Sequence, residues 1–366
     1  FPKNRIKTRS CRSPSSQKTS EAIMTMTDPS PLSFDRDYLL STHEYAAPHV
    51  VAGRNLHGGM LADGSYQPPR ALGRVPAMDA WEAALNERGG ALFPASAALL
   101  AGDRVPNTEQ QIVLVRNGLD VRLWNTLTIV GKIEAMGAFI GLWPVPDLQA
   151  AIVEDISGMA IGHLATGLLE AHGIDEGGIP DQGIGGHDEM WFAARDLAFG
   201  PDAYPDVEPQ KGLTREDATR YLPEVSEEVE QILSFLANVL IIEFRAEIGF
   251  AETQAILTTP GLFGERTADA VLGAEIVGRI RSDEEIHVRS LNLYLGEFSN
   301  VTFRTFGGGT IAGSELIGRF WDGMVEWATV IKPANDAERA ETDLFALIDS
   351  HPEAARIRAE FDAAGT

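Results

Sequence analysis

Residues 277–294 read VGRIRSDEEIHVRSLNLY, and their spacing of apolar side chains predicts part of a long helix from about Thr267 to Phe298. The residues on its inward-facing stripe are Val277, Ile280, Glu284, His287, Leu291 and Tyr294. Glu284 and His287 thus occupy positions where apolar side chains belong. A buried carboxylate is costly unless a partner compensates it, and a divalent metal ion is an effective partner. The three-residue spacing would let both side chains reach one ion.

A second pair of ionisable side chains breaks an apolar face on the preceding helix, which we predict from Pro223 to about Thr259. Glu243 and Glu247 lie one turn apart on a face that is otherwise formed by Leu236, Leu240, Phe250 and Leu257. Like charges at this spacing repel each other. Two inward carboxylates without a cation would therefore destabilise the helix.

Two earlier helices supply further candidates. A helix predicted from Asn107 to Gly141 places Glu134 on the stripe of Leu127 and Val130. A helix predicted from Asp147 to about Gly173 has one face formed by Ile152, Ile156, Met159 and His163. His163 is the natural ligand candidate on that helix.

The predicted metal ligands are four carboxylates and two histidines: Glu134, His163, Glu243, Glu247, Glu284 and His287. Oxygen donors together with imidazole suit iron or manganese. The arrangement resembles the ferritin-like diiron-carboxylate superfamily, in which each of two helix pairs contributes a Glu and then a Glu-x-x-His. Glu247 with the segment Glu284 to His287 is similar to the second of these pairs.

The first helix pair departs from the family pattern. Ala160 stands three residues before His163, where the family has Glu. Glu170 and His172 are only two residues apart, and Glu154 has no histidine three residues later. Glu243 is the candidate replacement for the missing ligand, and the reserve ligands are Glu154, Glu170 and His172.

The resemblance covers roughly residues 107–298 and implies an all-α fold, a ferritin-like four-helix bundle. Residues 174–222 would form its long crossover. The resemblance also implies two iron ions, or manganese, and dioxygen activation. The expected substrate is small and mostly apolar, and a reductase is the expected electron-donating partner.

Outside the bundle, residues 24–106 are rich in Pro, Gly and His and predict an irregular arm with one short helix. Residues 299–366 predict a hairpin or ordered loop followed by helices packed on the bundle. Residues 1–23 are basic and are expected to be a non-native or disordered extension, or else a targeting presequence.

The remaining histidines receive structural interpretations. His187, Asp188 and Glu189 follow glycines at the start of a short helix, where capping is the favoured role. His43, His49 and His57 are scattered along the arm without ligand spacing.

Composition limits the classes of function. The formal net charge of -23 and the pI near 4.7 argue against nucleic-acid binding. Cys11 is the only cysteine, which excludes a disulfide framework and suits a cytoplasmic location. No apolar run is long enough to predict a membrane span. An apolar stripe at Leu316, Phe320 and Met324 is either core or the face of a homodimer.

Two other functions fit the sequence. One is a metal-free helical scaffold or small-molecule-binding protein that kept the bundle and lost the site. The other is a haem-dependent helical enzyme in which His163 or His287 is the axial ligand.

Overall fold

The computed structural model describes residues 32–102, 104–209 and 220–365, which are predominantly helical, as the all-α prediction requires. The α-helices are α1 (Arg36–Leu39), α2 (Ala71–Glu87), α3 (Thr108–Arg116), α4 (Val121–Gly137), α5 (Leu148–Ala151), α6 (Leu168–Gly177), α7 (His187–Phe199), α8 (Glu227–Leu257), α9 (Thr267–Ser299), α10 (Gly313–Glu326), α11 (Lys332–Asp349) and α12 (Ala354–Ala364). Two antiparallel hairpins pair β1 (His49–Val51) with β2 (Arg54–Leu56) and β3 (Thr302–Arg304) with β4 (Thr310–Ala312). The extension predicted at residues 1–23 lies outside the described residues.

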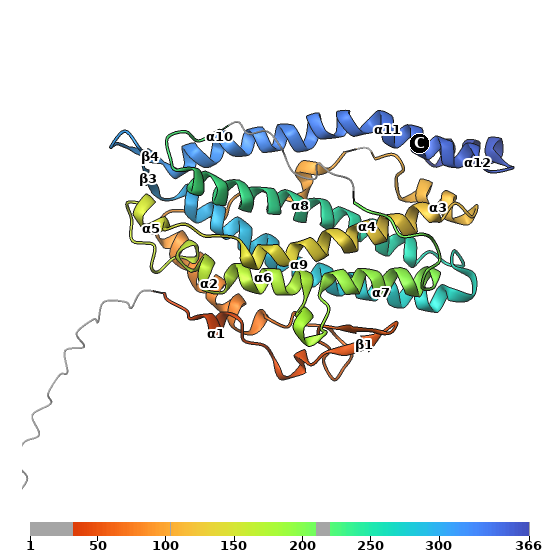
Figure 1. Cartoon of the computed structure of the whole chain (residues 1–366), viewed down its shortest axis with the longest axis horizontal. Helices are drawn as coiled ribbons and strands as arrows, with labels where there is room; N and C mark the ends of the chain where they lie inside the picture. Colours follow the sequence, from red (N-terminus) through yellow and green to blue (C-terminus); the bar gives the residue numbers. More distant parts are fainter. Residues whose placement is uncertain (1–31, 103, 210–219, 366) are drawn as a thin grey trace, which may run out of the picture. The chain divides into compact units, whose positions relative to one another are not determined.

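Helix α9 is the central element of the fold. It packs against α8, α7, α2 and α10 (Figure 1). All six side chains of its predicted stripe are buried, including Glu284 and His287. The helix therefore places two ionisable side chains inside the core, as its periodicity predicts.

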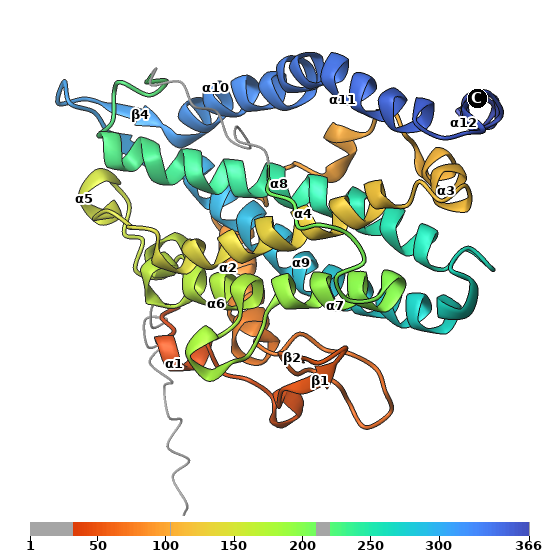
Figure 2. The same ribbon diagram turned by 45° about the vertical axis from the view of Figure 1, so that its right-hand side comes forward.

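Helix α8 runs beside α9 for most of its length (Figure 2). Its first turn is capped by Ser226, whose Oγ accepts a hydrogen bond from the backbone N–H of Val229 at 3.3 Å. Its buried face includes Leu236, Leu240 and Glu243. Glu243 is thus directed into the core beside α9.

The two helices predicted before residue 174 are interrupted in the structure. The first is divided into α3 and α4 at Gly118, whose φ of 74° ends a helix. The prediction of a second continuous helix, from Asp147 to about Gly173, is wrong. This part of the chain consists of α5, an irregular stretch, a 3₁₀ helix η4 (Ala160–Thr166) and α6, with Gly167 at φ 117° between the last two.

The segment predicted as a crossover contains α7, which is part of the core. This helix packs against both α4 and α9. A short glycine-containing turn joins α6 to α7, and the arm is attached to this turn. The N–H of His57 donates to the carbonyl of Gly185 at 2.9 Å, and the N–H of Gly185 donates to the carbonyl of Asn55 at 2.8 Å.

Glycines allow α6 to approach α4 and the 3₁₀ helix η3 (Ala138–Leu142) closely. A Cβ atom added at Gly137 would lie 2.6 Å from both Cβ and Cγ of Glu176. One added at Gly173 would lie 2.6 Å from the backbone nitrogen of Gly141. The close approach carries the side chain of Glu176 into the space between the helices.

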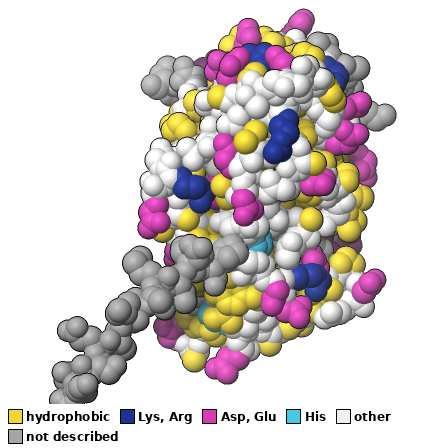
Figure 3. Space-filling model, turned by 90° about the vertical axis from the view of Figure 1, so that its left-hand side faces the viewer, with side chains coloured by type: hydrophobic (Ala, Val, Ile, Leu, Met, Phe, Trp, Pro, Cys, Tyr) yellow, Lys and Arg dark blue, Asp and Glu magenta, His cyan; other side chains and the backbone are white. Residues whose placement is uncertain are grey.

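The C-terminal helices cover one side of the bundle. In Figures 1 and 2, α10 and α11 extend along α8, and α12 packs against α3. Leu316, Phe320 and Met324 are buried against the chain's own core. Within the described part of the chain, no helix is both long and apolar enough to cross a membrane. Acidic side chains are spread over the face shown in Figure 3, with fewer Lys and Arg among them.

Glu297, near the end of α9, is a fully buried carboxylate that holds η4 in place. Its Oε2 accepts a hydrogen bond from the backbone N–H of Ile161 at 3.0 Å, and its Oε1 lies 3.4 Å from Nη2 of Arg88. Burial raises the pKa of Glu297 to about 7 against the opposing effect of these partners. The folded chain therefore binds this proton more tightly than the unfolded chain, whose pKa is near 4.5.

The resulting pH dependence can be measured with Glu297→Gln. In the wild type, the free energy of unfolding loses a contribution from Glu297 as the pH rises from about 4.5 to about 7. The glutamine variant lacks this loss. Its stability relative to the wild type should be higher at about pH 8 than at about pH 5 by roughly 3 kcal/mol, measured by denaturant unfolding. Glu341→Gln, at an exposed position of α11, is the matched control. If the free energies of unfolding of the variant and the wild type differed by the same amount at both pH values, the prediction would be contradicted.

Candidate metal centre

Four of the six predicted ligands come together in the core. Glu134 on α4, Glu243 on α8, and Glu284 and His287 on α9 are all buried, with exposed fractions of 8%, 4%, 4% and 0%. Each belongs to a group of His and carboxylate side chains whose donor atoms lie within 4.8 Å of one another. The polar side chains that interrupt the apolar stripes of three separate helices therefore lie close together in the core.

His163 is buried away from this cluster. Its Nδ1 lies 2.8 Å from the carbonyl oxygen of Met159, and its Nε2 lies 3.3 Å from the backbone nitrogen of Phe34. The ring also packs against Trp81, with the ring centroids 4.9 Å apart. Because the helix predicted through Ile152 and Met159 does not form, the stripe that pointed His163 inward does not exist.

Glu247 is also outside the cluster, and its side chain is exposed. It lies on the face of α8 that the sequence predicts to be buried. Beside this part of α8, however, a cavity of about 320 Å³ opens between α8 and α9, lined by Glu247, Phe250 and Glu284 among others. The carboxylate therefore lies in solvent at the mouth of a cavity that reaches Glu284.

The reserve candidates have different positions. His172 lies in the cluster. Glu170 forms an ion pair with Arg36 at the surface, and Glu154 accepts a hydrogen bond from the backbone N–H of Thr302 at 2.8 Å. Only His172 can contribute to a shared site.

The structure adds Glu176 from α6 and His187 from the start of α7, which the sequence interpretation did not include. Both side chains are buried, with exposed fractions of 4% and 0%. A signal was present in the sequence: the Asp-Glu dipeptide at 175–176 matches the Asp-Glu dipeptide at 283–284. Each dipeptide places one carboxylate in the cluster and one beside it.

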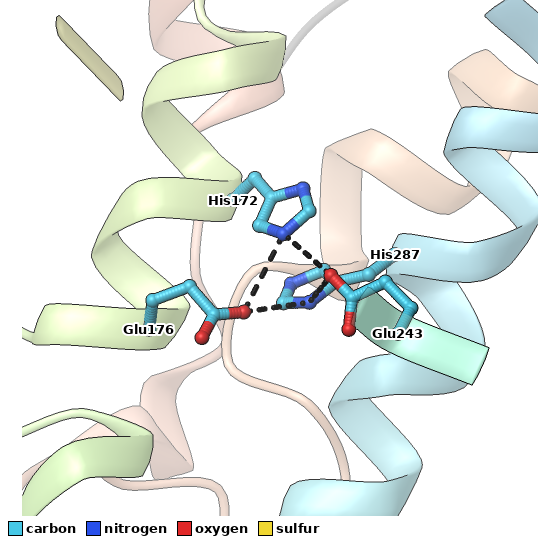
Figure 4. Close-up of side chains that lie close together, drawn as sticks. All are labelled: His172, Glu176, Glu243 and His287. Carbon is cyan, nitrogen blue, oxygen red and sulfur yellow. Dashed lines mark hydrogen bonds and ion pairs between the residues drawn. The ribbon is translucent and has the colours of Figure 1, made fainter. Parts of the chain in front are cut away.

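The first donor group consists of His172, Glu176, Glu243 and His287 (Figure 4). His172 Nε2 lies 3.0 Å from Glu243 Oε1 and 3.4 Å from Glu176 Oε1. His287 Nδ1 lies 3.1 Å from Glu176 Oε1. Donors bound to one ion with bonds of about 2.1 Å are separated by roughly 3 to 3.5 Å. The observed separations are close to that range.

The second donor group consists of Glu134, Glu176, His187 and Glu284. His187 Nδ1 lies 3.1 Å from Glu284 Oε1, 3.7 Å from Glu176 Oε1 and 3.9 Å from Glu134 Oε2. Glu176 belongs to both groups. Glu284 also reaches toward the first group, since its Oε2 lies 2.7 Å from His287 Nδ1. Two carboxylates thus lie where they could bridge two ions.

Several buried donor atoms in the cluster have no hydrogen-bond partner among the described residues. They are Glu176 Oε1, His187 Nδ1 and Glu284 Oε1. These atoms lie near one another at ion-pair distances, but without the geometry of a hydrogen bond. Unsatisfied buried polar atoms are uncommon and costly. Their convergence fits a site that a cation completes.

Two aspartates orient the histidines from behind. His287 Nε2 lies 3.0 Å from Asp175 Oδ2, and His187 Nε2 lies 3.0 Å from Asp283 Oδ2. Each Nε2–H can therefore donate to an aspartate, which leaves each Nδ1 directed into the cluster. A carboxylate behind a histidine in this way is a common feature of metal sites.

The N-terminal arm and α2 complete this outer layer. Asp175 is held by two buried guanidinium groups, those of Arg70 and Arg74. Asp283 accepts a hydrogen bond from the hydroxyl of Tyr66 at 2.8 Å, and its Oδ2 lies 3.3 Å from His57 Nε2. His57 thus supports the cluster from the arm without belonging to either Glu176-containing group.

In the metal-free cluster, burial and neighbouring charges shift the pKa of the carboxylates and histidines, and the shifts differ in direction from one group to another. Burial and neighbouring carboxylates raise the pKa of Glu134 and of Glu243 well above the usual range. Burial opposes charge on His187 and His287, but adjacent carboxylates raise the pKa of both well above the ordinary value. Burial and the neighbouring His287 lower the pKa of His172 to about 4.

The described side chains in and around the cluster carry more acidic than basic groups. Six carboxylates lie in or against the cluster, those of Glu134, Asp175, Glu176, Glu243, Asp283 and Glu284. Arg70 and Arg74 contribute two positive charges. With ionised carboxylates and neutral histidines, the excess is four negative charges, which two divalent cations would neutralise. A donor set of carboxylate oxygen and imidazole suits a divalent first-row transition metal ion.

Comparison of the chain with known protein families, with curated proteins and with solved structures finds no match.

Proposed function

We propose that the chain is a dinuclear metal enzyme that binds two iron ions, or manganese, and oxidises a small, mostly apolar substrate with dioxygen. The observation that carries the proposal is the convergence of seven buried donor side chains from five helices, arranged in two overlapping groups. The seven are Glu134, His172, Glu176, His187, Glu243, Glu284 and His287. The unpaired inward-facing atoms support the same assignment.

Some residues of the chain would hold the metal ions, and others would orient the residues that hold them. Glu176 and Glu284 would help to hold the ions, while Asp175 and Asp283 would fix the orientation and basicity of the two histidines in front of them. A pair of iron ions supplies the electron-transfer chemistry that dioxygen requires. In the overall reaction, a C–H bond, one dioxygen, two electrons and two protons give an alcohol and water. An external reductase would supply the electrons.

We further propose that α4, α6, α8 and α9 form a ferritin-like bundle with a modified first half. This proposal is supported by Glu134 and the Glu284 to His287 segment, which lie in the core as the resemblance implies, and by Glu243, which lies there instead of the Glu247 that the resemblance implies for the second pair. In the first half, His172 and Glu176 lie four residues apart on α6. His187 from α7 is an additional ligand candidate.

The haem alternative has less support from the contacts. Both ring nitrogens of His163 lie within hydrogen-bond distance of backbone atoms, and both of His287 face carboxylates. The ring of His163 therefore has no nitrogen left for an axial bond, and the carboxylates around His287 suit a metal cation rather than the apolar face of a porphyrin. The metal-free scaffold differs from our proposal in one measurable way, because it predicts no metal retention.

Dioxygen consumption tests the proposed activity. Protein loaded with ferrous iron under anaerobic conditions and then mixed with oxygenated buffer is expected to consume about one dioxygen per chain, since two ferrous ions supply two electrons. The His287→Ala chain should consume none above the rate of free iron. Full loading with two ions but no dioxygen uptake would contradict the oxidase proposal while leaving the metal site intact.

Asp283→Asn tests the orienting role of the outer carboxylates. Asparagine keeps the size of the side chain but no longer favours a proton on Nε2 of His187. Metal affinity is expected to fall by about 10- to 100-fold, measured by competition with a chelator of known affinity. Asp322→Asn on α10, outside the cluster, is the matched control. A metal affinity equal to that of the wild type would show that Asp283 does not orient His187 for metal binding.

A further inference from the structure

A second cavity, of about 270 Å³, reaches the cluster from the side of α4 and α8. Its walls include six large apolar side chains, those of Leu123, Val130, Ile133, Ile242, Phe250 and Ile256. Glu134 and Trp191 also line it, and Trp191 Nε1 donates to Glu134 Oε1 at 3.2 Å. The cavity is slightly smaller than those that hold drug-sized ligands.

Arg245 also lines this cavity, and its guanidinium forms no ion pair with a carboxylate of the described residues. Arg245 is partly buried, and its contact among the described residues is with the ring of Trp327, whose centroid lies 5.5 Å from Cζ. Asp336, the acidic group that acts on it electrostatically, is paired with Lys332. An arginine without an acidic partner is unexpected in a chain with 53 acidic and 30 basic residues.

The remaining charges of the cavity leave one positive charge in excess. Arg104 also lines the cavity, but Glu252 lies 3.4 Å from its Nη1 and balances it. Glu134 belongs to the proposed metal centre, where its charge is balanced. One monoanionic group beside Arg245 would therefore neutralise the cavity.

From these observations we infer that the cavity binds a small monocarboxylic acid with an apolar body. The carboxylate pairs with the guanidinium of Arg245, and the body lies along the apolar walls toward Glu134. A guanidinium group suits a carboxylate because two parallel N–H donors match its two oxygens. The charge balance at Glu134 and the role of this acid as the substrate rest on the proposed function, whereas the pairing of a carboxylate with Arg245 does not.

Octanoate and 1-octanol form a matched pair of probes, because they share a chain length and differ in charge. Each is titrated calorimetrically into the full chain, both metal-loaded and metal-free. Octanoate is expected to bind at least about tenfold more tightly than octanol, because a charge-assisted hydrogen-bonded pair is lost with the alcohol.

Two variants test separately how the carboxylate and the apolar chain of the probe are bound. Arg245→Gln should weaken octanoate binding by at least about tenfold and change octanol binding by less than about threefold. Arg319→Gln, at the surface of α10, controls for the lost charge. A Cβ atom at Gly249 meets nothing within 4 Å, and this glycine lines the cavity. Gly249→Leu should therefore block both probes without loss of thermal stability, since leucine favours the helix. Gly318→Leu on α10, also in open space, is its control.

The outcomes distinguish this inference from the metal proposal. Binding that survives Arg245→Gln, or that requires metal and ignores Arg245, would overturn the inference by placing the carboxylate elsewhere. Equal binding of octanol and octanoate would overturn it as well. A chain that binds octanoate through Arg245 but retains no metal would leave the inference standing and refute the proposed function.

Discussion

A Glu176→Ala chain is expected to retain no metal under conditions in which the wild type holds two ions. Glu176 belongs to both donor groups through its Oε1 atom, so its loss leaves each group with three donors. The remaining carboxylates would then be less able to hold either ion. Metal per chain after desalting, measured by elemental analysis, reports the result.

Two companion variants make this expectation specific. Of the two groups that share Glu176, His172 belongs to the first and His187 to the second. His172→Ala and His187→Ala should therefore each lose about one ion and keep the other. Circular dichroism checks that every variant retains its helices. If His172→Ala and Glu176→Ala lost equal amounts of metal, two overlapping sites would be the wrong description.

A Gly137→Ala chain is expected to lose metal although no donor has been changed. The added methyl group would lie 2.6 Å from both Cβ and Cγ of Glu176, so that side chain or helix α6 must move. The φ of Gly137 is -59°, which alanine adopts readily, so backbone strain does not contribute. We expect a decrease in metal content together with a loss of about 1–3 kcal/mol in stability from overpacking.

The control for this substitution is Gly318→Ala. Gly318 is also helical, and a Cβ atom there meets nothing within 4 Å. Alanine should stabilise that helix and leave metal content unchanged. Wild-type metal content in Gly137→Ala would mean that the position of Glu176 is not important for binding.

Helical periodicity predicted the part of the centre that lies on long, regular helices. Glu134, Glu243, Glu284 and His287 interrupt apolar stripes, and a stripe fixes the direction of a side chain when the helix is continuous. Glu247 shows the limit of this reasoning. It shares the face of Glu243, but whether that face is covered depends on the packing of α9, which a single helix does not specify.

The first half of the centre depends on irregular structure that the periodicity does not encode. His163 is directed inward only if one helix continues through Ile152, whereas Gly167 starts α6 in a new direction. His172 and Glu176 enter the core on this separate helix. His187 was interpreted as a capping residue because it follows glycines, and those glycines form the turn that places it opposite Asp283.

The most direct test of the central claim is the metal content of the wild-type chain. Protein expressed in medium supplemented with iron and manganese, and purified without chelator, is analysed for each element and for protein concentration. The two overlapping donor groups predict close to two ions of iron or manganese per chain. A wild-type chain that is folded and retains no metal would contradict the account and favour the metal-free scaffold.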